Sequence, residues 1–267
     1  AGIEGRDFGA PRCPAGVFHG FGINATDQIP FQSLAIRRLG AVLAEREARA
    51  EGEGREGGQQ QQRGAGEYGE GDQFIGATVP NTRKVAAEFA ALPIDEIFAL
   101  GQSPIHEHRL CALVILVNQF DKSKDQQQRK KLFGTWMKLL RGGFINNWDL
   151  VDASAHRMGA WLVGRSDALD FMTKLAKSKK LWERRSAIIF TFAFIRAGSL
   201  DESLEIAELL VDDEHDLIHK AVGWVIREVG KRDIEMLRAF LHVHAATMPR
   251  TMLRYAIEKM SETERKR

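Results

Sequence analysis

From Thr78 onward, apolar residues recur at intervals of three and four along the chain. This spacing places them on one side of an α-helix and is typical of amphipathic helices. Neither a period-two alternation nor an Asn-Gly hairpin signal is visible in this part of the sequence. The pattern therefore predicts an all-α protein, with helices at 80–92, 94–101, 104–121, 125–140, 147–163, 166–178, 181–197, 200–213, 215–231, 233–246 and 249–261.

The predicted helices repeat. Small residues stand once per helix pair at spacings of 42, 34, 34 and 35 residues: Cys111, Ala153, Ala187, Ala221 and Ala256. A basic residue precedes four of them by two positions: Arg109, Arg185, His219 and Arg254. A small residue at one place per unit lets neighbouring helices approach closely, which predicts an α-solenoid. The spacing fits HEAT, armadillo or tetratricopeptide units, and the concave side of any of these suits a peptide, a protein or a duplex.

Before Thr78 the pattern is weaker. Residues 1–29 have no clear period, and Ile3 to Arg6 match a factor Xa site, so this stretch is either irregular or a cloning remnant. Residues 30–50 predict one N-terminal helix. Residues 51–71 are rich in Gly, Glu and Gln and cannot bury enough apolar surface to order themselves, so we expect a flexible linker. The repeat domain is predicted to span 72–267.

Composition narrows the class of protein. Of 267 residues, 44% are hydrophobic and 28% charged, as in globular proteins, and no apolar run is long enough to cross a bilayer. Two cysteines make no disulfide framework, and the start lacks the order of a secretory signal, so we expect a cytoplasmic protein. Residues 104–267 carry 28 basic against 22 acidic side chains, a net +6, which suits a polyanionic partner.

Several stretches resemble the AlkD family of DNA glycosylases, which are built from HEAT-like repeats. The resemblance covers roughly residues 66–262, and its most specific stretches are INNWDLVD (145–152) and HDLIHKAVGWVIREVGKR (215–232). Other matching stretches are GEYGEGDQFIGATVPNTRKVA (66–86), SPIHEHRLCALVILV (103–117), LWERRSAI (181–188) and TMPRTMLRYAIEKM (247–260). The resemblance implies a solenoid of HEAT-like repeats with a concave DNA-binding face.

The resemblance also implies roles for individual residues. The family's Trp followed four residues later by Asp corresponds to Trp148 and Asp152, and its second tryptophan to Trp224. Its phosphate-contacting arginine corresponds to Arg185. The chain departs from some relatives at Asn147, where they carry a second aromatic residue, and this puts the range of lesions in doubt.

These residue types suit the removal of a cationic base. Alkylation at N3 or N7 charges a purine, which then leaves as a neutral molecule, so the enzyme must mainly stabilise an oxocarbenium-like sugar. Asp152 could offset that charge and orient a water, while the indoles of Trp148 and Trp224 attract cations. Arg185 would hold a phosphate by bidentate contact. The resemblance implies action without flipping the base into a pocket.

Three further basic residues could reach phosphates: Arg250 and Arg254 at the last predicted helix and Lys180 before Trp182. The sequence implies neither a cofactor nor a metal. We expect the partner to be double-stranded DNA with alkylated bases, with the protein acting as a monomer, associated with the nucleoid if the source is bacterial.

Structural readings of the same residues stay open. A tryptophan on an amphipathic helix is usually a core residue, and Trp182 is expected to pack between repeats. Asp149 is a rival of Asp152 for the catalytic role, or it stabilises a helix start. Arg185, as one of a series of basic residues, could make an inter-repeat salt bridge. The alternative function is a non-catalytic HEAT-repeat scaffold that binds DNA or protein.

Overall fold

The computed structural model describes residues 37–43, 45 and 72–265, all within the second of two compact units, residues 31–267. The predicted segment 1–29 and the predicted linker 51–71 lie outside these residues. Residues 37–43 are helical, within the predicted helix 30–50, and Leu39 and Leu43 are fully buried. The described residues form helices and one isolated bridge, between Gln73 and Ile105, which confirms the all-α prediction.

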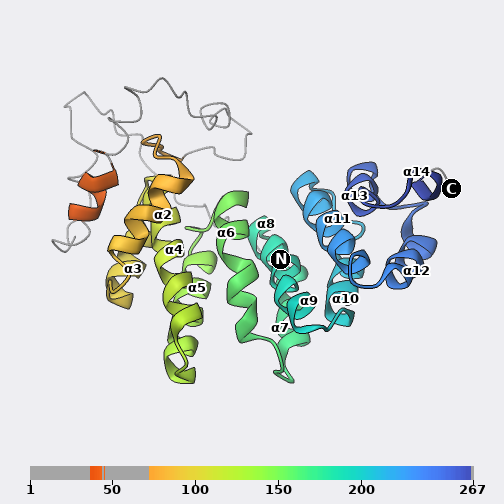
Figure 1. The fold of residues 1–267 in the computed structure, drawn as a ribbon, viewed down its shortest axis with the longest axis horizontal. Coiled ribbons are helices and arrows are strands. Elements are labelled where there is room, and N and C mark those ends of the chain that lie inside the picture. The colour runs from red at the N-terminus through yellow and green to blue at the C-terminus, as the bar shows by residue number, and fades with distance from the viewer. Residues whose placement is uncertain (1–36, 44, 46–71, 266–267) are drawn as a thin grey trace, which may run out of the picture. The chain divides into compact units, whose positions relative to one another are not determined.

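The helices follow one another across the unit in chain order (Figure 1). They are α2 (Val79–Glu88), α3 (Ile94–Gly101), α4 (His106–Lys122), α5 (Gln126–Arg141), α6 (Trp148–Met158), the 3-10 helix η2 (Gly159–Trp161), α7 (Ala168–Ala176), α8 (Leu181–Phe190), α9 (Phe192–Ala197), α10 (Asp201–Leu209), α11 (Asp216–Gly230), α12 (Ile234–His244), α13 (Arg250–Ala256) and α14 (Glu262–Arg265). No helix of the described part is both long and apolar enough to cross a bilayer.

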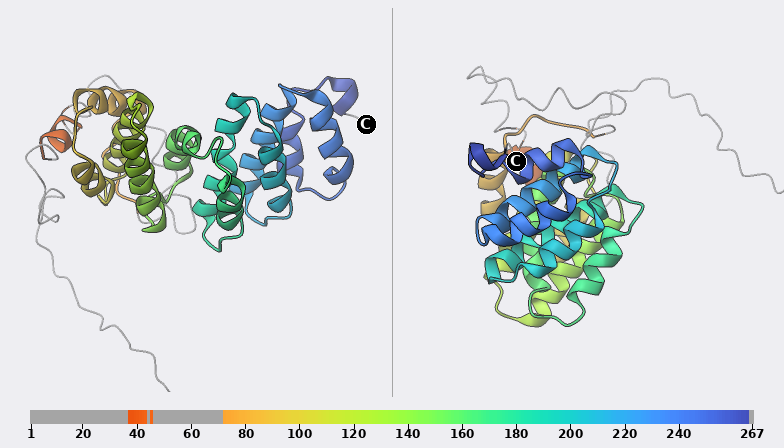
Figure 2. Two further views of the ribbon diagram at one scale, coloured as in Figure 1. Left: turned by 90° about the horizontal axis from the view of Figure 1, so that it is seen from below. Right: turned by 90° about the vertical axis from the view of Figure 1, so that its right-hand side faces the viewer.

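The helices from α3 to α13 form two rows. The A row contains α3, α5, α7, α10 and α12, and the B row contains α4, α6, α8 with α9, α11 and α13. Each B-row helix packs against the next one in the row, and α3, α7 and α10 pack against the B-row helices that follow them. In the view along the stack, successive pairs lie one behind another (Figure 2). This is the predicted α-solenoid architecture.

Helices α8 and α9 together fill the predicted helix 181–197. Thr191 separates them, although its backbone stays in the right-handed helical region with φ −64° and ψ −18°. Its hydroxyl donates to the carbonyl of Ile188 at 2.7 Å. A threonine that bonds back to its own helix competes with the regular backbone ladder and often bends the helix. We therefore treat α8 and α9 as one B-row helix with a local irregularity.

Small residues allow the B row to pack closely, as the sequence predicts. Cys111, Ala187, Ala221 and Ala256 are buried, and Ala153 is partly buried. One of the tightest approaches is at Gly223 of α11, where an added Cβ would lie 2.4 Å from the carbonyl oxygen of Met252 on α13. Only glycine fits such a contact without moving one helix away from the other.

A recurring polar contact closes the turn before three B-row helices. Arg109 donates to the carbonyl of Ser103 at 2.9 Å, Arg184 donates to that of Ser178 at 3.1 Å, and His219 contacts that of Asp213. In each case the acceptor lies six residues before the basic side chain. In this contact Arg184 corresponds to Arg109, whereas Arg185 is the residue that shares with Arg109 the spacing to a buried small residue.

Candidate active site on helix α6

Trp148 is the first residue of α6, and its side chain reaches the surface. Asn147 precedes it in extended conformation (φ −141°, ψ 154°), and the Asn147 side chain accepts a hydrogen bond from the Trp148 backbone N–H at 2.7 Å. Trp148 is 37% exposed, the only tryptophan among the exposed large apolar residues of the described chain. An exposed indole at the start of a helix is available to an incoming ligand.

Asp152 lies one helical turn after Trp148 and forms a two-point ion pair with Arg185 on α8. Arg185 Nε donates to Asp152 Oδ1 at 3.0 Å, and Arg185 Nη2 donates to Asp152 Oδ2 at 2.7 Å. The two side chains are 17% and 5% exposed. Bidentate pairs of this kind fix orientation as well as charge. The structure thus pairs Asp152 with Arg185 one turn after Trp148, while the roles predicted for these residues stay predictions.

Arg185 has a third partner. Its Nη1 donates to the backbone carbonyl of Leu217 at the start of α11. The guanidinium thus joins α6, α8 and α11, the inter-repeat salt bridge that the sequence left open as a structural reading. The phosphate contact that the resemblance implies for Arg185 stays a prediction.

Burial and charge act in opposite directions on Asp152. Burial raises the pKa of Asp152 above its ordinary value, and the Arg185 guanidinium draws it part of the way back. The nearby carboxylate of Asp149 raises it further. Each carboxylate oxygen can accept about two hydrogen bonds, so the pair with Arg185 leaves acceptor capacity at the partly exposed edge of Asp152.

Asp149 is held by α4, the other B-row neighbour of α6. His106, the first residue of α4, contacts Asp149 Oδ2 through Nε2 at 2.8 Å and Asp72 Oδ2 through Nδ1 at 3.0 Å. Phe74 stacks on the imidazole with ring centroids 4.7 Å apart. Burial alone would lower the pKa of His106, but the hydrogen bonds and charges of Asp149 and Asp72 raise it to about 9.

Asp72 belongs to a dense polar cluster. Asp72 Oδ1 lies 2.6 Å from Arg109 Nη2 and accepts a hydrogen bond from Asn146 Nδ2 at 2.8 Å. Burial acts to raise the pKa of Asp72, but its bonds to His106 and Asn146 and the charge of Arg109 outweigh this and lower it. Sequence reasoning missed Asp72, because it directly follows the predicted linker, far from α6 along the chain.

Trp224 lies on α11, a different B-row helix from those that carry Asp152 and Arg185. Its ring packs against Phe192 with centroids 4.7 Å apart and planes tilted by 55°, and both side chains are partly buried. Phe192 follows Arg185 by seven residues, so two helical turns bring it to roughly the same side of its helix. Trp224 thus packs against the first residue of α9, where α9 and α11 meet.

The three other predicted DNA-binding residues are exposed. Arg250 is the first residue of α13, and the Arg254 guanidinium lies 5.8 Å from the ring centroid of Tyr255. Lys180 immediately precedes α8, its side chain is 60% exposed, and Nζ donates to the carbonyl of Arg141 at 2.9 Å. Arg250 opens α13 and Lys180 directly precedes α8, whereas Arg254 lies in the last turn of α13.

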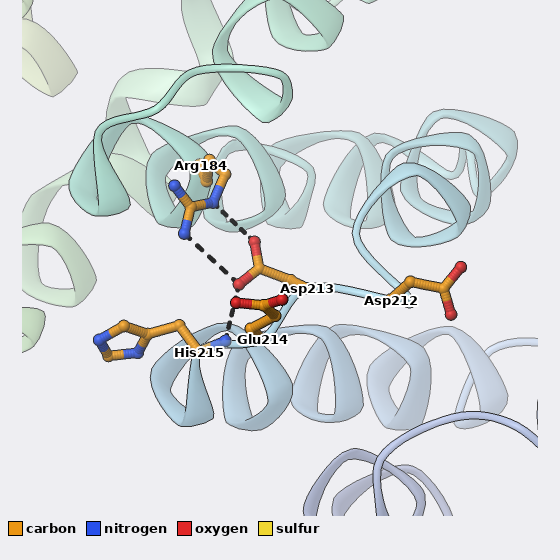
Figure 3. A pocket seen from close by; sticks show the side chains of 5 residues that line it. All are labelled: Arg184, Asp212, Asp213, Glu214 and His215. Carbon is orange, nitrogen blue, oxygen red and sulfur yellow. Dashed lines mark hydrogen bonds and ion pairs between the residues drawn. The ribbon is translucent and has the colours of Figure 1, made fainter.

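A cavity of about 550 Å³ opens at the turn between α10 and α11 (Figure 3), lined by Arg184, Asp212, Asp213, Glu214 and His215. Arg184 Nε donates to Asp213 Oδ2 at 2.6 Å, so the cation there is already paired. No predicted site residue lines this acidic cavity. Within the described residues, no group of three His, Cys, Asp or Glu side chains could hold a metal ion.

Comparisons with known proteins identify a family and a similar fold. The family profile described as DNA alkylation repair enzyme matches residues 46–260. Among solved structures, the chain is similar to a "Predicted DNA alkylation repair enzyme from Enterococcus faecalis", with a TM-score of 0.58 at 15% identity over 88% of this chain and 100% of that one. No curated protein matched the sequence. At this identity, the structural similarity supports the fold alone.

Proposed function

The chain belongs to the DNA alkylation repair enzyme family, and from this membership we propose that it is a monofunctional DNA glycosylase of cationic alkylated purines. Its substrates would be 3-methyladenine and 7-methylguanine in duplex DNA. Helix α6 carries the proposal, because a carboxylate with fixed orientation, Asp152, lies one turn from the exposed indole of Trp148.

The proposed reaction breaks the bond between C1′ of the sugar and the purine nitrogen. The charged purine keeps the bonding electrons and leaves as a neutral base. Water then adds to C1′ and gives up a proton to a proton acceptor. The product is an abasic site. Asp152 offsets the positive charge that develops on the sugar and orients the water. The proposed chemistry includes no covalent step on a lysine, so we expect no strand cleavage.

The other residues support this step from the protein side. Trp148 presents an electron-rich face to the cationic nucleotide, and Trp224 would act on the same strand farther along the B row. Arg185 orients Asp152 and is a positioning residue, with a phosphate contact as an additional prediction. Lys180, Arg250 and Arg254 would contact phosphates and set the register of the duplex. We further propose that the lesion stays in the duplex without flipping.

The test is release of methylated base from DNA that carries mixed methyl adducts. We expect the wild-type protein to release 3-methyladenine or 7-methylguanine, and Asp152→Asn to lower the rate at least about 100-fold, roughly 2.7 kcal/mol of transition-state stabilisation. Asparagine keeps the shape but cannot offset a positive charge. Unchanged release by the variant would remove Asp152 from the mechanism.

A matched control exists at the opposite end of α6. Asp121 of α4 pairs with Arg157 of α6 at 2.5 Å, so Asp121→Asn also breaks a carboxylate–arginine pair between B-row helices. We expect it to keep base release within twofold of wild type. A loss equal to that of Asp152→Asn would mean that helix packing, and not the charge at Asp152, controls the rate.

One observation favours the second candidate, a non-catalytic scaffold. Both carboxylate oxygens of Asp152 bind Arg185, as they would in a purely structural pair. A scaffold would bind duplex DNA in a salt-dependent way and release no base from any alkylated substrate. The base-release assay on wild-type protein therefore decides between the two.

A further inference from the structure

The two carboxylates in the first turns of α6 are each bound by a cation from a different neighbour. Asp149 binds His106 of α4 and Asp152 binds Arg185 of α8, and α6 packs between these two helices. The turn that presents Trp148 is therefore held from both flanks. Arg185 belongs to the site already described, whereas His106 and Asp72 do not.

We infer that His106, held by Asp72, is a positioning residue that fixes Asp149 and with it the turn of α6 that carries Trp148 and Asp152. The inference rests on the proposed glycosylase function for its catalytic consequence. We call the three side chains Asp72, His106 and Asp149 the flank clamp.

The geometry of the clamp requires a charged imidazole. Both ring nitrogens of His106 lie within 3.0 Å of a carboxylate oxygen, and ionised carboxylates only accept hydrogen bonds. Both nitrogens must then donate, which only the protonated ring can do. The side chains of His106 and Asp72 are 1% and 3% exposed, so water does not replace these contacts. The raised pKa of His106 agrees with this arrangement.

The charges around His106 come from three elements. Asp72 acts from the segment before α2, Asp149 from α6 and Arg109 from α4 itself. Glu107, the next residue, turns its carboxylate to the backbone N–H groups of Ile75 and Gly76 at 3.1 and 2.8 Å. His106 thus lies between Asp72 and Asp149 and contacts both, and its positive charge offsets the repulsion between the two carboxylates.

Loss of that proton would affect the proposed site in two ways. The contact between α4 and Asp149 would lose one hydrogen bond, which frees the turn that presents Trp148. The charge of Asp149 would then act uncompensated on Asp152, whose pKa it already raises. We expect both effects to lower the turnover of bound substrate more than binding, because Lys180, Arg250 and Arg254, which would contact phosphates, lie outside α4 and α6.

The experiment combines NMR titration of His106 with the pH dependence of base release. In wild-type protein we expect His106 to titrate near pH 9, and the release rate to fall as pH rises through that value. Asp72→Asn removes one of the two carboxylates, so both the titration and the alkaline limb of the rate should move down by at least one pH unit. His106→Gln should lower kcat about tenfold or more, leave KM within twofold and abolish the alkaline limb.

His108→Gln is the matched control. His108 lies two residues away on α4 and is also buried, but its Nδ1 contacts the hydroxyl of Ser103 at 3.1 Å and burial lowers its pKa to about 4. We expect this variant to keep the alkaline limb of wild type. Titration of His106 near its ordinary value of 6.5, or an alkaline limb that is the same in wild type and Asp72→Asn, would overturn the inference.

Failure of the proposed function gives a different result. If wild-type protein releases no methylated base at any pH, the glycosylase proposal fails. The flank clamp is then tested by spectroscopic measurements that do not depend on activity. Its readout is then the His106 titration together with Trp148 fluorescence, taken as the difference between wild type and Trp148→Phe. A fluorescence change that follows His106 and shifts in Asp72→Asn supports the clamp, and a flat response through pH 9 overturns it.

Discussion

Arg185 determines both the orientation and the charge of Asp152. Two of its nitrogens bind the carboxylate and a third binds Leu217, so the side chain cannot turn toward DNA without giving up part of this set. Breaking a buried pair by removing one partner typically costs about 3–5 kcal/mol. A conservative substitution is therefore the sharper probe of its role.

We predict that Arg185→Lys lowers the rate of base release and shifts its acid limb to higher pH. Lysine keeps the positive charge but cannot bind both carboxylate oxygens in the same geometry. The Asp152 carboxylate must be ionised to act, and Arg185 is the main group that lowers its pKa against the effect of burial. With that contact weakened, protonation inactivates Asp152 at a higher pH.

The measurement is the pH–rate profile of base release under single-turnover conditions. Arg184→Lys, one residue away on α8, is the control. Arg184 pairs with Asp213 and donates to the carbonyl of Ser178 in the turn before α8. An unmoved acid limb in Arg185→Lys, with weaker DNA binding instead, would assign the residue to phosphate contact.

The sequence predicted part of the candidate site. Trp148, Asp152 and Arg185 follow from the resemblance, and the structure pairs Asp152 with Arg185 one helical turn after Trp148; their roles stay predictions. Asp72 could not be predicted, because it meets His106 and Asn146 only through folding and sits beside the predicted linker. Periodicity identifies the side of a helix on which a residue lies, but not its partner on another element.

At the level of helices, periodicity located most elements to within two or three residues. Helix α3 was predicted at its observed bounds, whereas α13 ends at Ala256 and not at 261. The predicted helix 181–197 hides an irregularity, because the hydroxyl of Thr191 competes for a backbone carbonyl without changing the apolar pattern. Spacing also does not distinguish the adjacent arginines 184 and 185. Arg184 binds the turn before α8, whereas Arg185 binds Asp152.

We predict that Gly223→Ala destabilises the protein by about 1–3 kcal/mol, as overpacking of a tight core does. The new methyl group would lie 2.4 Å from the Met252 carbonyl and 2.6 Å from Tyr255 Cβ, so α13 must move away from α11. Gly134→Ala is the control on α5, where an added Cβ meets nothing within 4 Å and helix propensity favours alanine by about 1 kcal/mol.

Chemical unfolding of both variants measures the difference. Gly223→Ala should unfold at lower denaturant concentration than wild type, and Gly134→Ala at an equal or higher one. Equal stability of Gly223→Ala and wild type would mean that the close contact at Gly223 does not limit how tightly α11 and α13 pack.

Across the whole described unit, the starts of the B-row helices share one edge. His106 at the start of α4 meets Asp149 in the first turn of α6, Asp152 meets Arg185, and Arg185 meets Leu217 at the start of α11. Helix starts carry partial positive charge and attract anions. We propose that the phosphate backbone follows this edge past Trp148.

The charges along this edge are uneven. Lys180, Arg250 and Arg254 are exposed cations, whereas Asp212 and Glu214 are exposed carboxylates at the turn before α11. The carboxylates would repel phosphates locally, so the basic residues on either side should carry most of the electrostatic attraction. Their contribution can be measured directly, because each phosphate contact releases counterions.

We predict that replacing Lys180, Arg250 and Arg254 with Ala reduces the slope of log K against log salt by about 0.9 for each side chain. Affinity for duplex DNA should fall by a similar factor with and without a lesion, since phosphate contacts carry no base information. The control replaces three exposed lysines at the turn before α5 and on α5 itself, Lys124, Lys130 and Lys131, which changes net charge equally. Equal slopes for the two triple variants would show that net charge governs binding and that the B-row edge is not the DNA-binding surface.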